Sequence, residues 1–107
     1  MNLHLLLEDH DPDMRPMLVG QFTTRAVARQ ARRYAQALQD EFARDYRPAG
    51  PAHSSRPHRI SLVKVPMPKS LRLATDGLED WKTSHLASIN DARAQVDLGP
   101  SKLTAAA

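Results

Sequence analysis

The stretch FTTRAVARQARRYAQALQDEF, residues 22–42, constrains the fold most, because its pattern predicts one long amphipathic helix. Apolar side chains recur there at three- and four-residue spacing and therefore share one stripe of the helix. The members of this stripe are Val27, Ala31, Tyr34, Leu38 and Phe42. Thr23 or Thr24 suits the N-cap and Pro48 stops the helix, so we expect it to end near Asp45. A stripe of this length has to be buried against a second layer.

Three other segments have the pattern of β-strands, and a fourth is ambiguous. Residues 2–8, NLHLLLE, alternate between two faces, one of which holds only leucines. Residues 17–22, MLVGQF, follow a polar loop and would pair with the first strand as an antiparallel hairpin. Residues 59–65, RISLVKV, are the most β-like segment and are followed by prolines. Residues 70–75, SLRLAT, fit either a short edge strand or coil.

The C-terminal third predicts a second amphipathic helix. Asp76 and Glu79 have the spacing of a capping pair at its start, and Gly99 followed by Pro100 ends it. The apolar stripe of this helix consists of Leu78, Trp81, His85, Ile89, Ala92 and Val96. The helix either covers the sheet or packs on a partner protein, where tryptophan is a frequent anchor.

These segments together predict an α+β fold of order β-β-α-β-(β)-α. A small antiparallel or mixed sheet of three to four strands would carry one long helix and a C-terminal amphipathic helix on one face. The chain of 107 residues suffices for one domain, which we place at residues 1–98. A connection rich in proline, serine and glycine lies within it at 47–58, and residues 99–107 form a tail.

The passage from strand to helix, VGQFTTRAVARQA, resembles half of a SPOR-type repeat over residues 17–38. It also resembles segments of small phage and bacterial proteins. The sequence shows no second half-repeat, so we carry over no peptidoglycan binding. The frequent alanine and the excess of arginine over lysine favour a prokaryotic or phage origin.

The sequence contains few residues that point to metal binding or catalysis. It has no cysteine, and its five histidines lack the spacing of a metal site. No phosphate-binding loop, dinucleotide fingerprint or nucleophile elbow occurs. The acidic stretch EDHDPD at 8–13 alternates its carboxylates but has no glycine or glutamate where a calcium loop needs them. We therefore expect no metal, no cofactor and no enzymatic activity.

The hydropathy pattern bears on where the protein works. No apolar run approaches the length that spans a bilayer. The N-terminal run MNLHLLLEDHD has neither the basic start nor the cleavage site of a signal peptide. We expect the protein in the cytoplasm of the bacterium that produces or hosts it, or in a virion, and we expect no membrane partner.

Four arginines in the first half of the long helix are the leading candidates for a binding surface: Arg25, Arg29, Arg32 and Arg33. No acid accompanies them, and cations near a helix N-terminus oppose the helix dipole at a cost of roughly a few tenths of a kcal/mol each. Most of them fall, with Gln36, nearly opposite the apolar stripe. A solvated helix face would explain them, and so would contact with a phosphate backbone or an acidic protein surface, because arginine suits both.

We expect a non-enzymatic protein-binding module that docks on a larger macromolecular assembly, either as a virion component or as an inhibitor of a host machine. The four arginines are the expected contact residues, followed by Trp81. The alternative is a nucleic-acid-binding accessory protein that uses the same arginines on phosphates, which the net charge of +3 permits. Base readout is disfavoured, because RISLVKV has no aromatic ring and no helix-turn-helix pattern follows the arginines.

Overall fold

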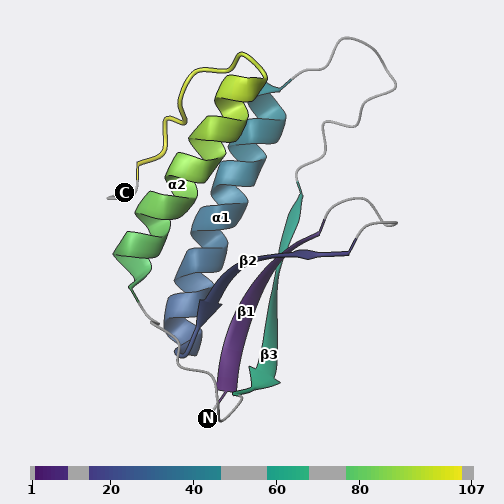
Figure 1. Ribbon diagram of the computed structural model, residues 1–107, viewed down its shortest axis with the longest axis vertical. Coiled ribbons are helices and arrows are strands. Elements are labelled where there is room, and N and C mark those ends of the chain that lie inside the picture. The colour runs from purple at the N-terminus through teal and green to yellow at the C-terminus, as the bar shows by residue number, and fades with distance from the viewer. Residues whose placement is uncertain (1, 10–14, 47–57, 68–76, 105–107) are drawn as a thin grey trace.

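A computed structural model describes residues 2–9, 15–46, 58–67 and 77–104 (Figure 1). Its elements are β1 (Asn2–Asp9), β2 (Met17–Phe22), α1 (Arg25–Asp45), β3 (Arg59–Pro66) and α2 (Leu78–Gln95). The order β-β-α-β-α, with an antiparallel sheet and two helices, confirms the predicted α+β class. The ambiguous strand at 70–75 lies outside the described residues, as do most of the acidic loop and of the connection at 47–58.

The three strands form an antiparallel sheet of order β2-β1-β3, so the N-terminal strand is central. Both helices lie on the same side of this sheet (Figure 1). The covered face of β1 is the one with Leu6 and Glu8, since Leu6 belongs to the core cluster and Glu8 accepts a hydrogen bond from Gln39 of α1. The all-leucine face of β1 therefore points away from the helices. A shift of register between Leu6 and Leu7 marks a bulge against β2.

α1 lies directly on the sheet because small residues line its inner side. Ala28, Ala31 and Ala35 are fully buried against a core cluster that includes Leu6, Phe22 and Ile60. Alanine keeps the helix backbone close to the strands and has no side-chain entropy to lose on burial. The predicted stripe is confirmed at its centre, where Tyr34 and Leu38 are also buried, whereas its ends at Val27 and Phe42 are half-buried.

α2 packs on α1 and reaches the sheet through Trp81. The indole contacts both the sheet-side core and a second cluster of Tyr34, Leu38 and Ile89. Its ring meets Phe22 edge-on at 5.5 Å, and its Nε1 donates a hydrogen bond of 2.9 Å to the Val19 carbonyl. The single tryptophan thus joins the two parts of the core.

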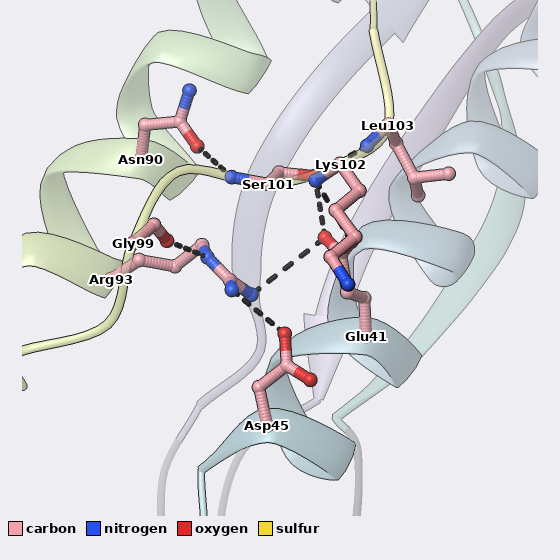
Figure 2. A network of polar contacts seen from close by, with 8 residues as sticks. All are labelled: Glu41, Asp45, Asn90, Arg93, Gly99, Ser101, Lys102 and Leu103. Carbon is pink, nitrogen blue, oxygen red and sulfur yellow. Dashed lines mark hydrogen bonds and ion pairs between the residues drawn. The ribbon is translucent and has the colours of Figure 1, made fainter.

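The chain after α2 returns along the helices and is held by buried charges (Figure 2). Arg93 donates hydrogen bonds to the Gly99 carbonyl and to Asp45, each 2.7 Å long, and its Nη1 lies 3.7 Å from Glu41. Glu41 in turn accepts from the Ser101 hydroxyl and from the backbone of residue 102. The Arg93 hydrogen bond holds the pKa of the Asp45 carboxyl below its ordinary value. Residues 99–104, which the sequence predicts as part of a tail, are therefore anchored to both helices.

No helix in the described part of the chain is long and apolar enough to cross a membrane.

Candidate functional site

The four predicted arginines surround one cavity, which lies between α1 and the outer edge of β3. Its volume is about 470 Å³. The residues that line it are Arg25, Arg29, Arg32, Arg33, Arg59, Ser61 and Leu62. Five of these seven side chains are guanidinium groups, which stay protonated at any physiological pH. The cavity is therefore strongly cationic and suits an anionic ligand.

Helical spacing brings the arginines of α1 together on one flank of the helix. Residues 25 and 29 are about one turn apart, and the adjacent residues 32 and 33 lie about one further turn along, so these side chains lie above one another. The sequence places Arg32 and Gln36 nearly opposite the buried stripe, and the structure corrects this prediction. Both side chains instead reach β3, where Arg32 Nε donates a hydrogen bond of 2.9 Å to the Ile60 carbonyl. The arginine flank consequently borders the sheet edge.

Gln36 completes the contact between α1 and the edge of β3. Its side-chain oxygen accepts from the Ile60 amide at 2.8 Å, and its nitrogen donates to the His58 carbonyl at 3.0 Å. The same nitrogen lies 3.1 Å from Asp40, one turn along the helix. These contacts fix the distance between α1 and β3 at one end of the cavity.

The cationic charge of the cavity is not neutralised by ion pairs within the described residues. Arg25, Arg29, Arg33 and Arg59 are all exposed, and none of them forms a described ion pair or hydrogen bond. In the sheet, Asp9 pairs in register with Arg59 and accepts a hydrogen bond of 2.8 Å from Ser61. Mutual repulsion of the guanidinium groups therefore favours the entry of an anion.

Trp81, the other predicted contact residue, lies away from this cavity. It is half-buried and packs against Phe22, Tyr34 and His85, so its ring surface is used inside the protein. Sequence reasoning missed Arg59 and Ser61 as members of the site. Arg59 is the first residue of a predicted strand, but nothing in the sequence indicates that this strand is an edge next to the arginine flank.

Outside the cavity, the described residues offer little else for chemistry. No group of histidine, aspartate or glutamate side chains among them could hold a metal ion. His85 stacks on Trp81 with the ring centroids 4.8 Å apart, and its Nε2 is buried without a hydrogen-bond partner. Burial lowers the pKa of His85, although the charge of Glu8 acts in the opposite direction.

This pKa shift predicts a loss of stability in mild acid. A folded-state pKa below the ordinary value of 6.5 means that the unfolded chain takes up the proton first, so the free energy of unfolding falls as the pH drops below 6.5. His85→Phe keeps a ring against Trp81 and removes the titration. We expect the variant to lose less stability than the native protein between about pH 7.5 and about pH 5.5, as measured by urea denaturation. Equal losses would contradict this assignment.

Comparisons with known proteins found no family model that matches the chain, no similar curated protein and no similar solved structure.

Proposed function

We propose that this protein is a non-enzymatic binding protein that docks on an acidic region of a partner protein through the arginine-lined cavity. The observation that supports this proposal is the convergence of five arginines on one cavity without a described ion pair among Arg25, Arg29, Arg33 and Arg59. A guanidinium group binds a carboxylate through two parallel hydrogen bonds, which supply both affinity and geometry. Arg32 is already oriented by the Ile60 carbonyl, which lowers the entropy lost when it binds.

The residues of the cavity support binding in preference to catalysis. Arginine does not exchange protons near neutral pH, so none of the five can act as a general acid or base. Ser61 is the one hydroxyl in the lining, and it donates its hydrogen bond to Asp9, with no histidine in the lining. An activated nucleophile needs a base within hydrogen-bond reach and a third group that orients the base. Asp9 lies within reach of Ser61, but none of the lining residues is described as orienting Asp9.

An acidic protein suits the cavity better than a nucleic acid does. None of the seven lining residues is aromatic, so the cavity offers no ring on which a base could stack. The site is also a local concavity at a strand edge, whereas duplex binding uses an extended basic surface. We further propose, from the sequence, that this acidic partner belongs to a larger assembly, such as a virion or a host machine.

The test compares two doubly substituted proteins that have the same net charge. One carries Arg29→Gln with Arg33→Gln in the cavity, and the control carries Arg44→Gln with Lys102→Gln, which are exposed and do not line the cavity. The probe is a fluorescent glutamate-rich peptide, titrated at low and moderate salt. We expect the cavity substitutions to weaken binding at least about tenfold, because a hydrogen bond to a charged group contributes about 1.5–3 kcal/mol. The control should change it less than about twofold.

Two results of this experiment would overturn the proposal. Equal weakening by both variants would mean that net charge alone attracts the peptide. Tighter binding of a short duplex DNA than of the acidic peptide, with a steep loss between low and moderate salt, would favour the nucleic-acid alternative.

A further inference from the structure

The edge of β3 determines how a partner segment can enter the cavity. In an antiparallel sheet, the backbone N–H and C=O groups of successive residues point alternately toward and away from the neighbouring strand. Those of Ile60 point away from β1, because they bond to Gln36 and Arg32 of α1. The regular register of β1 with β3 then directs the N–H and C=O groups of Leu62 and Lys64 outward as well.

The outward groups of β3 differ in whether they have partners. Those of Ile60 are bonded to side chains of α1, and Pro66 at the end of the strand has no N–H to offer. Between these two points, the outward N–H and C=O groups of Leu62 and Lys64 have no hydrogen-bond partner among the described residues. An edge of this kind is a template for one more strand.

The arginines of α1 run beside this unpaired part of the edge. α1 and β3 point in opposite directions, because Gln36 contacts His58 and Ile60, whereas the earlier Arg29 lines the cavity with Leu62. The part of α1 from residue 25 to Arg32 is about 10 Å long. From Ile60 to residue 64 the strand advances about 13 Å. The arginine flank of α1 and the unpaired part of the β3 edge are therefore of similar length and lie next to each other.

The residues that line the cavity also indicate that it lies beside the edge of β3. The side chain of Leu62 belongs to the helix-covered face of β3, since it packs against the core cluster. Arg59 and Ser61 belong to the opposite face, by the alternation of a strand. A cavity that touches residues from both faces of β3 lies beside the strand, where the next strand of the sheet would run.

We propose that an acidic partner segment binds here as an additional β-strand, pairing with β3 at Leu62 and Lys64. This inference rests on the proposed function and adds the conformation and residue pattern of the partner. Alternate side chains of the added strand lie on the helix side of the sheet, where carboxylates meet the arginines of α1. The intervening side chains lie on the opposite face and extend the apolar surface that includes Leu5, Leu7 and Val63. The partner segment is therefore extended and alternates acidic with apolar residues.

A second copy of this chain is a poorer occupant of the same edge. Pairing β3 with its own copy would bring two rows of arginines together, along with Arg59 and Lys64 of both strands. Like charges directly opposite in a sheet are destabilising. Charge complementarity therefore favours an acidic strand over a homodimer through this edge.

The experiment uses the full chain and four synthetic peptides with the same numbers of glutamate and valine residues. The first alternates glutamate and valine over about seven residues, the length of a typical strand, and the second has the same residues with all glutamates before the valines. The third and fourth keep the alternating order, with backbone N-methyl groups on the glutamates or on the valines. Only one of these two sets of amides can face β3, because successive amides of a strand point to opposite sides. One methylated peptide is therefore the matched control for the other.

We expect the alternating peptide to bind at least about tenfold more tightly than the block peptide, because only the alternating order places every carboxylate on the arginine side. One N-methylated peptide should lose at least about tenfold in affinity, while the affinity of the other is nearly unchanged. Which of the two loses affinity shows whether the added strand runs antiparallel or parallel to β3. Amide hydrogen exchange gives a second readout. The amides of Leu62 and Lys64 should exchange rapidly in the free protein and become protected by the peptide, whereas the amide of Val63 is protected in both states.

The outcomes separate the two proposals. Equal binding of all four peptides, with loss in the Arg29→Gln, Arg33→Gln protein, would overturn strand addition and leave acidic recognition intact. Binding that is indifferent to the arginines would overturn the proposed function itself. Protection of Leu62 and Lys64 in the free protein, together with a dimeric mass in solution, would show that a second copy occupies the edge and would overturn the assignment to an acidic partner.

Discussion

Replacing Arg93 by alanine is expected to lower the free energy of unfolding by about 3–5 kcal/mol, because it leaves Glu41 as an uncompensated buried charge. Glu41 is 3% exposed and Arg93 is 4% exposed, so solvent cannot replace the missing partner. The substitution also removes the hydrogen bonds to the Gly99 carbonyl and Asp45, which hold the C-terminal segment against the helices (Figure 2). Urea or guanidinium denaturation near neutral pH measures the loss.

A matched double variant isolates the buried charge as the cause. Glu41→Gln with Arg93→Met removes both charges and keeps most of the side-chain volume, so we expect it to lose distinctly less stability than Arg93→Ala alone. The amide that Glu41→Gln introduces can still accept from the Ser101 hydroxyl, as the native Glu41 carboxylate does in this structure. A double variant that is less stable than Arg93→Ala would show that the unpaired Glu41 charge is not the main cause of the loss, and would contradict this account.

Replacing Trp81 by alanine should also cost about 3–5 kcal/mol, because it opens a cavity where the two core clusters meet. Trp81→Phe keeps much of the apolar contact and loses the hydrogen bond to the Val19 carbonyl, so we expect a smaller cost. Thermal or denaturant unfolding of both variants provides the comparison.

The Trp81→Phe variant also tests whether Trp81 acts in binding. Because its ring packs on Phe22, Tyr34 and His85, we expect Trp81→Phe to bind the glutamate-rich peptide with unchanged affinity. A folded Trp81→Phe protein with markedly weaker binding would place the indole in the contact surface, as the sequence alone predicts.

Periodicity alone predicts much of the fold, because burial of one helix stripe or one strand face leaves a regular pattern in the chain. The helix at Arg25–Asp45 and the strand at Met17–Phe22 begin and end close to the positions that their residues predict. The buried polar groups leave no such pattern. Glu41 and Arg93 occupy positions where a solvated residue would be expected, and their burial is explained by contacts that form only in the folded chain, with each other, with Asp45 and with the segment after α2.

The face of β1 that the helices cover is a second point that the sequence leaves open. Strand alternation identifies an all-leucine face, and hydropathy would place that face under the helices. The structure covers the other face instead, where Leu6 meets the small residues of α1 and Glu8 meets Gln39. The choice depends on complementary shapes and hydrogen bonds between distant segments, which no local pattern contains.

The sequence by itself determined the helices and strands among the described residues, the α+β class and the arginine-rich flank of the long helix, because each of these depends on the spacing of neighbouring residues. Only the tertiary structure decided that this flank lies along the β3 edge, since that position depends on strand order and on the contacts of Arg32 and Gln36. That placement joins Arg59 to the helix arginines in one cavity and sets them beside unpaired backbone groups at Leu62 and Lys64. Residues far apart in the chain become one site only when the sheet brings them together.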